Sequence, residues 1–193
     1  MAHPPDTRGG RSVWEGHRVR LRAIEPSDWE AFGRFDADSE AARHGYWIPF
    51  PRSNEAARRW AEREAMRESD GDNFRFAIET LAGELVGTLN TVDCDRRHGT
   101  FGYGIALGRE YWRKGYASEA IVLALRYFFG ELRYQKVTVR IYAFNEASIR
   151  LHERLGFQAE GRLRQMIHTD GQFHDECLFG MTNEEFDRLN GRS

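Results

Sequence analysis

The sequence predicts a mixed α/β fold in a single domain. Segments with strand and helix patterns follow in the order strand, two helices, three strands, helix, strand, helix, two strands. A helix joins the fourth strand to the fifth, and a helical crossover of this kind places two strands parallel in one sheet. The 193 residues suit one domain with a hydrophobic core, and no shift in composition marks a linker.

The first half of the chain contains one strand, two helices and the start of a sheet. Pro26 and Asp28 suit the first turn of a helix, and Ser53 suits the cap of the next helix. Opposite charges at helical spacing, such as Glu55 and Arg59, favour a solvated face for this second helix over a recognition helix. The expected segments are a strand at 18–23, a helix at about 28–35, an irregular stretch at 36–50, a helix at about 54–68, a hairpin of 74–78 and 84–91, a polar loop at 93–99 and a strand at 100–107.

The second half alternates helices and strands. Apolar residues recur at i, i+3, i+4 and i+7 along one helix face, at Ile121, Ala124, Leu125 and Phe128. Gly156 is placed to end a later helix as a glycine C-cap, and Asp-Gly at 170–171 suits a hairpin turn. The expected segments are a helix ending near 130, a strand at about 136–142, a helix at about 146–155 and strands at 158–167 and 173–181.

Composition and charge exclude several classes of function. The net charge of −2 and the sequence pI near 6.4 leave no basic excess to neutralise phosphates, so nucleic acid is not expected as a partner. No apolar run is long enough to span a bilayer and no signal peptide is recognisable, so we expect no membrane partner and a cytoplasmic setting. Cys94 and Cys177 form neither a disulfide framework nor a metal-ligand spacing, and no metal is expected.

A turn with one glycine leads directly into the helix that contains Ile121. This stretch reads Tyr-Trp-Arg-Lys-Gly-Tyr-Ala-Ser-Glu-Ala over residues 111–120. Free backbone N–H groups converge at a helix N-terminus, where the dipole is positive, and Gly115 lets a ligand approach the backbone closely. We interpret this loop as a pyrophosphate site. The spacing fits neither a Walker phosphate loop nor the three-glycine dinucleotide fingerprint.

Residues 112–117 resemble the acyl-CoA loop of the GNAT superfamily, the acetyl-CoA-dependent N-acetyltransferases. The superfamily pattern is Gln/Arg-x-x-Gly-x-Gly/Ala, and Trp112 departs from it at the first position. The sequence pattern Tyr-Trp-x-Lys-Gly-Tyr-Ala-x-Glu-Ala is similar to that of the RimJ/RimL-like branch, the ribosomal-protein N-terminal acetyltransferases. Residues 145–157 are similar to a second GNAT segment, Asn-x-x-Ser-x-x-Leu-x-x-x-x-Gly-Phe, at the expected distance downstream. The resemblance covers essentially residues 16–186.

The resemblance implies a GNAT domain over residues 13–193. Residues 1–12 are polar and contain two prolines and two glycines, so we expect them to form a flexible tail. It implies a mostly antiparallel sheet with flanking helices, and one parallel strand pair that splays apart to admit the pantetheine arm of acetyl-CoA. The implied cofactor contacts come from the strand before the loop, the loop and the start of the later helix: Ile105, Ala106, Leu107, Arg113, Lys114, Gly115, Tyr116, Ala117, Ser118 and Asn145. Asn145 is equally an ideal helix N-cap, and Lys114 is equally a solvated lysine.

Acetyl transfer from a thioester to an amine needs positioning, a donor for the oxyanion, an acid for the thiolate and a route for the amine proton. The resemblance makes Ser148 the candidate acid. His152 occupies the position of a Tyr that serves as acid in many members, and it shares a helix face with Ser148. The strand at 100–107 contains no acid, so the base is assigned to Asp93, with Asp95, Asp175, Glu176 or no dedicated base as alternatives.

The family places the acceptor pocket beside the aromatic stretch that contains Tyr46, Trp47 and Phe50. These three residues are the candidate acceptor wall, and a satellite hydrophobic cluster is the alternative. Three nearby acids at positions 36, 38 and 40 would attract a cationic amine. The sequence therefore predicts an acetyl-CoA-dependent N-acetyltransferase that acts on a protein N-terminus or on a small amine such as a polyamine or aminoglycoside, with a homodimer expected by analogy alone. The alternatives are a non-catalytic acyl-CoA sensor and a transferase of longer acyl chains.

Overall fold

A computed structural model describes residues 12–45 and 48–191, and all structural statements below refer to these residues. The predicted tail at 1–12 lies outside the described residues except for Ser12. The sheet consists of β1 (Val19–Arg22), β2 (Arg75–Thr80), β3 (Leu85–Asp95), β4 (Thr100–Leu107), β5 (Lys136–Tyr142), β6 (Gln158–Thr169) and β7 (Gln172–Thr182). The helices are α1 (Trp29–Ala37), α2 (Ser39–Gly45), α3 (Asn54–Ala65), α4 (Tyr116–Gly130), α5 (Glu146–Leu155) and α6 (Asn183–Asn190), with short 3-10 turns η1 (Pro26–Asp28) and η2 (Arg109–Tyr111).

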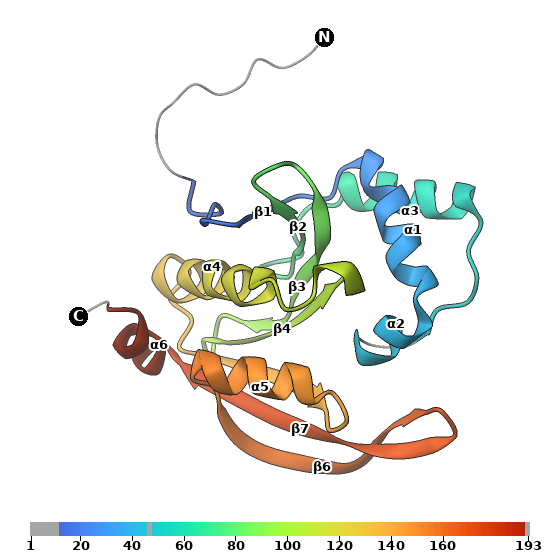
Figure 1. The fold of residues 1–193 in the computed structure, drawn as a ribbon. Helices are drawn as coiled ribbons and strands as arrows, with labels where there is room; N and C mark the ends of the chain where they lie inside the picture. The colour runs from blue at the N-terminus through green and yellow to red at the C-terminus, as the bar shows by residue number, and fades with distance from the viewer. Residues whose placement is uncertain (1–11, 46–47, 192–193) are drawn as a thin grey trace.

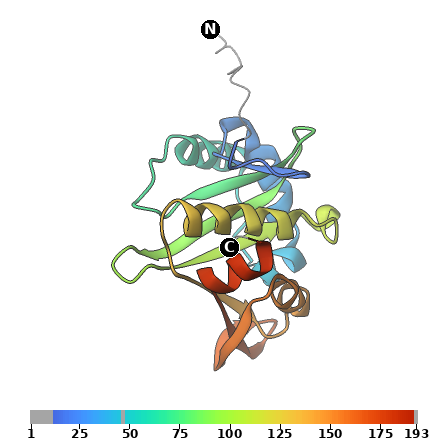
Figure 2. The same ribbon diagram turned by 90° about the vertical axis from the view of Figure 1, so that its left-hand side faces the viewer.

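The seven strands form one mixed sheet in the order β1-β2-β3-β4-β5-β7-β6, so that β1 and the β6–β7 hairpin lie at opposite ends (Figures 1 and 2). Every neighbouring pair is antiparallel except β4 and β5, which are parallel as predicted. The parallel ladder joins only residues 100–102 of β4 to residues 136–138 of β5. The strands therefore pair at their starts and separate towards their ends, where the loop to α4 and the loop to α5 begin.

The two faces of the sheet are covered by different helices. The main core joins the strands to α4, α5 and α6, and its most deeply buried members include Phe101, Phe128 and Phe186. A smaller cluster packs α1 and α3 against Ala77 of β2 on the opposite face. Figure 1 shows α4 and α5 lying across the same face of the sheet, with α1, α2 and α3 grouped apart from them. This arrangement places the N-terminus of α4 and the start of α5 at the end where β4 and β5 separate.

The local signals predicted in the sequence are confirmed at several turns. Gly156 ends α5 with φ +93°, and Asp170 and Gly171 both have positive φ in the β6–β7 turn. Two helices were missed. Residues 36–50 were expected to be irregular, but Ser39–Gly45 form α2, and the C-terminal residues after β7 form α6. The predicted polar loop at 93–99 is also shorter, because β3 continues through a bulge to Asp95. Within the described part of the chain, no helix combines the length and apolar character needed to cross a membrane.

Candidate active site

The gap between β4 and β5 exposes backbone groups of β4. The Gly108 N–H donates to the Val86 carbonyl at 3.0 Å, and backbone groups alternate in direction along an antiparallel ladder. Ala106 therefore bonds to β3, whereas Ile105 and Leu107, beyond the parallel ladder, direct their N–H and C=O groups towards the gap. The predicted cofactor contacts on β4 thus differ in orientation, and the geometry does not support Ala106 as a contact, because its backbone donor is used within the sheet.

The loop between β4 and α4 is fixed at both ends. The Trp112 indole N–H donates to the Leu107 carbonyl at 2.9 Å, which ties the loop to the edge of the gap. Gly115 precedes the first helical residue with φ +82°, a left-handed conformation that glycine adopts without strain. The next residues, Tyr116, Ala117 and Ser118, are the first turn of α4, whose N–H groups have no partner within the helix. The predicted donors thus lie together at one helix N-terminus.

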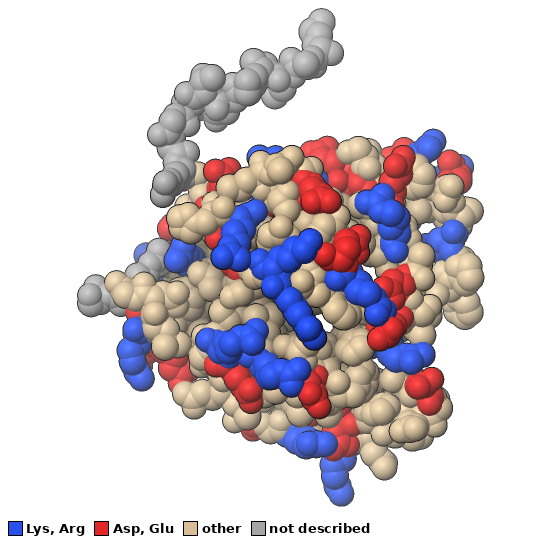
Figure 3. Space-filling model, viewed as in Figure 1, with Lys and Arg blue, Asp and Glu red and all other residues tan. Residues whose placement is uncertain are grey.

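The basic side chains of the loop are exposed. Arg113 has φ +60° and is solvent-exposed, and the Lys114 ammonium lies 5.4 Å from the centroid of the Tyr111 ring. Figure 3 shows Lys and Arg side chains gathered over α4 beside a hollow in the middle of this face. A local excess of positive charge next to a helix N-terminus favours an anionic ligand even though the whole chain carries a net charge of −2.

The start of α5 borders the other side of the gap. The Asn145 side chain accepts a hydrogen bond from the Ser148 N–H at 3.1 Å, which is the predicted N-cap, and donates to the His44 carbonyl at 3.0 Å. Asn145 therefore joins the start of α5 to the end of α2. The Ser148 side chain is half-buried, and its hydroxyl lies 3.4 Å from Nδ1 of His152.

His152 is buried and hydrogen-bonded at both ring nitrogens. Nδ1 lies 2.8 Å from the Ser148 carbonyl, which can only accept, so Nδ1 carries the proton. Nε2 then accepts from the Tyr103 hydroxyl at 2.9 Å. The side chain is 2% exposed, and burial lowers the pKa of His152. The Nδ1 proton is bonded to the Ser148 carbonyl and Nε2 accepts from Tyr103, so neither ring nitrogen is free to protonate a thiolate. The geometry therefore does not support His152 as the acid; its side chain joins α5 to β4.

The acids proposed as bases lie in different environments. Asp93 is exposed in the bulge of β3 with φ +51°, and no described contact links it to Ser148 or to the gap, so the geometry does not support Asp93 as the base. Asp95 caps the β3–β4 turn through two backbone N–H groups. Asp175 bonds to Arg162 and to the Gln165 N–H, and these bonds lower its pKa. Glu176 is buried and bonds to Arg140 at 3.1 Å.

The residues predicted to line the acceptor pocket are only partly described. Tyr46 and Trp47 lie outside the described residues. Phe50 is 93% exposed, so its ring is not packed as a satellite cluster. The three acids nearby are all paired with arginines: Asp36 pairs with Arg52, and Asp38 and Glu40 share Arg109. The idea that these acids form a free cation-attracting surface is therefore corrected.

Three contributors to this region were not predicted. Tyr103 lies on β4 at the point where the parallel pairing ends, and its alternation with Phe101 already marked it as inward-facing. Trp112 tethers the loop, although the sequence showed it only as a departure from the pattern. His44 packs its ring against Trp112 and Phe144, which brings α2 over the gap. No signal in the sequence related His44 to residues a hundred positions later. Among the residues described, no group of three or more His, Cys, Asp or Glu side chains is arranged to hold a metal ion.

Comparison with known proteins identifies the class of protein that has this arrangement. The model of the acetyltransferase (GNAT) domain matches residues 18–158, which include the gap, the loop and the whole of α5. The fold is likewise that of an acetyltransferase. The crystal structure of the acetyltransferase (GNAT family) from Bacillus anthracis is 25% identical in sequence, with a TM-score of 0.74 over 88% of this chain and 98% of the other.

Curated relatives agree with this class. The SPbeta prophage-derived uncharacterized N-acetyltransferase YokL of Bacillus subtilis is 45% identical over 180 residues, 93% of this chain and 98% of the relative. Spermidine N(1)-acetyltransferase of Escherichia coli is 29% identical over 166 residues, 84% of this chain and 87% of the relative. The chain therefore belongs to the GNAT family. It is an acetyl-CoA-dependent N-acetyltransferase.

Proposed function

We propose that the protein transfers the acetyl group of acetyl-CoA to the primary amine of a small molecule, with a protein N-terminus as the second candidate acceptor. The amino-acid sequence of the loop supports placing the chain in the RimJ/RimL-like branch. The observation that carries the proposal is the gap between β4 and β5, which has a helix N-terminus at its outer end and the Ser148 hydroxyl on its α5 side.

Each part of acetyl-CoA has a proposed place in this gap. The pyrophosphate lies at the first turn of α4, beside Gly115, where free N–H groups and the helix dipole favour negative charge. The pantetheine arm lies along the edge of β4, where Ile105 and Leu107 direct their backbone groups away from β3. Asn145 keeps the start of α5 in place beside this arm through its bonds to Ser148 and His44.

The transfer itself needs few side chains. The neutral amine attacks the thioester carbonyl, the new N–C bond forms, and the C–S bond breaks after a tetrahedral oxyanion. The backbone N–H groups of β4 that face the gap are the proposed donors to that oxyanion. The Ser148 hydroxyl donates its proton to the departing thiolate and recovers one from solvent. The amine loses its proton to water, since the described acids near the gap are paired with arginines or with backbone N–H groups.

The charges beside the proposed acceptor pocket support a substrate with one amino group. A polyamine carries several charges and needs unpaired carboxylates along its length. Here Arg109 occupies both Asp38 and Glu40, and hydrogen bonding to Arg109 lowers the pKa of Asp38. Displacing the arginine would expose two like charges to each other. We therefore expect monoamines and N-terminal peptides to be better acceptors than spermidine.

A thiol-release assay tests the proposal. Purified protein and acetyl-CoA are incubated with monoamines, aminoglycosides, spermidine and N-terminal peptides, and CoA binding is measured separately by calorimetry. Acceptor-dependent release of CoA supports the proposal and names the acceptor class. Preference for spermidine would overturn the monoamine assignment. Tight binding of CoA without release from any amine would favour the acyl-CoA sensor.

The role of Ser148 is tested in the same assay. We expect Ser148→Ala to lower kcat roughly a hundredfold, because general acid catalysis contributes about 10²–10⁴. The affinity for CoA should change little, since the hydroxyl acts on the thiolate. Ser27→Ala is the matched control, because this exposed serine in η1 lies on another part of the molecule. A Ser148→Ala variant with the wild-type kcat would remove Ser148 from the mechanism.

A further inference from the structure

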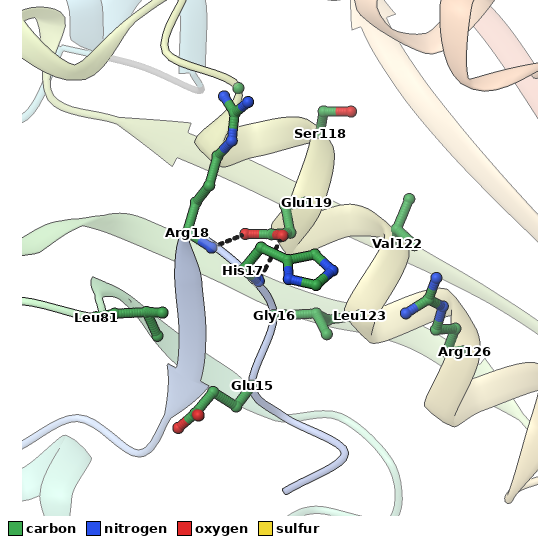
Figure 4. A pocket seen from close by; sticks show the side chains of 11 residues that line it. Glu15, Gly16, His17, Arg18, Leu81, Ser118, Glu119, Val122, Leu123 and Arg126 are labelled. Atoms are coloured by element: carbon green, nitrogen blue, oxygen red, sulfur yellow. Dashed lines mark hydrogen bonds between the residues drawn. The ribbon is translucent and has the colours of Figure 1, made fainter. Parts of the chain in front are cut away.

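The Glu119 carboxylate in the first turn of α4 is bound by three consecutive backbone N–H groups. Oε1 accepts from His17 at 2.8 Å, and Oε2 accepts from Arg18 at 2.7 Å (Figure 4). Oε2 also accepts from Val19 at 2.9 Å. Gly16 gives the carboxylate room, because a Cβ at this position would lie 2.6 Å from Cδ of Glu119. One side chain of α4 therefore fixes the backbone that leads into β1, a hundred residues away in sequence.

This anchoring sets the position of the Arg18 side chain. Its guanidinium donates from Nη1 to the Lys114 carbonyl at 2.8 Å. It also lies over Gly115, since a Cβ there would come 2.6 Å from the same Nη1 atom. Figure 4 shows Arg18 extending from the start of β1 towards the N-terminal end of α4. Within the described residues this is its single hydrogen bond, so the other guanidinium N–H groups are free to bind a ligand.

A guanidinium at this position favours the binding of an anion. The N-terminus of α4 carries the positive end of the helix dipole, so a cation held beside it is unfavourable unless negative charge lies nearby. Glu119 offsets part of this charge, but both of its oxygens are already occupied by backbone donors. A pocket of about 740 Å³ adjoins the guanidinium and is lined by Arg18, Gly115, Ser118, Glu119 and Arg126, among others. The pocket opens next to the first turn of α4 and has room for a phosphate group.

We propose that Arg18 binds the pyrophosphate of CoA and that Glu119 is the positioning residue that holds Arg18 over the loop. The inference rests on the proposed placement of the pyrophosphate at the first turn of α4. Arginine suits this task, because its planar group offers two parallel N–H donors to phosphate oxygens. Neither residue touches the reacting thioester, so both act on affinity for the cofactor and leave the chemical step unchanged.

Calorimetry with CoA and dephospho-CoA tests the contact. We expect Arg18→Ala to weaken both ligands by roughly tenfold to a hundredfold, because a charge-assisted hydrogen bond to phosphate is lost. Both ligands carry the pyrophosphate, and only CoA carries the 3′-phosphate, so a loss confined to CoA would overturn the pyrophosphate assignment. Arg18→Lys keeps the positive charge but lacks the two parallel N–H donors of arginine. Its affinity for CoA should therefore lie between those of the wild type and Arg18→Ala. Arg188→Ala is the control, because this exposed arginine lies on α6, which packs against the far end of α4.

A double-mutant cycle tests the positioning role of Glu119. Glu119→Gln leaves one oxygen to accept where two accepted before, so we expect CoA affinity to fall by about threefold to tenfold. The same substitution made in Arg18→Ala protein should have no further effect on affinity. Equal losses in both backgrounds would show a merely structural carboxylate and overturn the positioning role. Glu131→Gln at the other end of α4 is the control for the loss of one carboxylate.

The outcomes separate this inference from the proposed function. Wild-type protein that fails to bind CoA would overturn the placement of the cofactor and the inference with it. Wild-type binding of CoA together with unchanged affinity in Arg18→Ala would overturn the inference alone. Thermal unfolding of each variant identifies any that fails to fold, and Arg18→Lys then supplies the comparison.

Discussion

The Tyr103 hydroxyl donates a hydrogen bond to Nε2 of His152 at 2.9 Å, and this bond spans from β4 to α5 where the parallel strands separate. Both side chains are buried, and their rings are 5.9 Å apart and nearly parallel. Because Nδ1 of His152 is bonded to the Ser148 carbonyl, the pair connects β4 to the residue proposed as the acid. This buried polar pair therefore links the edge of the gap on β4 to the residue proposed as the acid.

Removing the Tyr103 hydroxyl should destabilise the protein. Tyr103→Phe keeps the ring but leaves Nε2 of His152 buried without a donor, and an unsatisfied group of this kind costs about 1–3 kcal/mol. Denaturant unfolding measures the difference. Tyr127→Phe is the matched control, because the Tyr127 hydroxyl makes no hydrogen bond to another described residue, and its stability should stay within about 0.5 kcal/mol of wild type. Equal stability of the two variants would mean that the Tyr103–His152 bond contributes nothing.

Stability should also depend on pH through His152. Burial lowers its pKa in the folded protein below the ordinary value of 6.5, so the unfolded chain binds more protons in the interval between the two values. The free energy of unfolding is therefore highest above pH 6.5 and falls as pH drops below it. His152→Gln, which does not titrate, should have a flatter profile between pH 7.5 and about 5. The exposed His168→Gln serves as control and should keep the wild-type slope; an unchanged slope in His152→Gln would contradict the argument.

The parts of the fold that the sequence predicts are those whose signal is local. The helical periodicity of residues 121–128 and the glycine stop at 156 give α4 and the end of α5. The missed helix α2 has no buried residue, so it shows no apolar stripe, and its contact through His44 is tertiary. The missed helix α6 did carry a signal. Thr182 and Glu185 form a capping box ahead of the buried Phe186, and this spacing is visible in the sequence.

The residues of the candidate site likewise divide into those that the local sequence predicts and those whose partners are distant in the sequence. The N-cap at Asn145 and the glycine before α4 follow from neighbouring residues, and the structure has both. The partners of His152 could not be predicted, because Tyr103 lies 49 residues away on another element and no periodicity relates the two. The sequence pattern also treats consecutive residues of a strand alike. Only the ladder register separates Ala106, which bonds to β3, from Leu107, whose carbonyl faces the gap.

Trp112 should matter more for cofactor binding than its exposure suggests. Trp112→Phe keeps an aromatic ring but removes the N–H that donates to the Leu107 carbonyl, and a bond of this kind contributes about 0.5–1.5 kcal/mol. Because this bond fixes the start of the phosphate loop, we expect the Kd for CoA to rise severalfold in calorimetry.

The matched control for this prediction is Trp29→Phe. The ring of Trp29, at the start of α1, lies under the guanidinium of Arg58 on α3. The Trp29 indole N–H has no hydrogen-bond partner among the described residues. The affinity of the Trp29→Phe variant for CoA should equal that of the wild type. If both tryptophan variants bind CoA with wild-type affinity, the tether at Leu107 does not order the loop.

Substitution by alanine at two glycines, both of which have space for a Cβ, should change the free energy of unfolding in opposite directions. A Cβ added at Gly33 or at Gly83 would meet no atom within 4 Å, but Gly33 lies inside α1 and Gly83 has φ +86° in the β2–β3 turn. Gly33→Ala should raise the free energy of unfolding by about 0.5–1 kcal/mol, because alanine loses less backbone entropy in a helix. Gly83→Ala should lower it by about 1–2 kcal/mol, because a Cβ is strained in the left-handed region. For a chain of this length the two Tm values should differ by several degrees, and shifts of the same sign would show that space, rather than backbone conformation, decides the outcome.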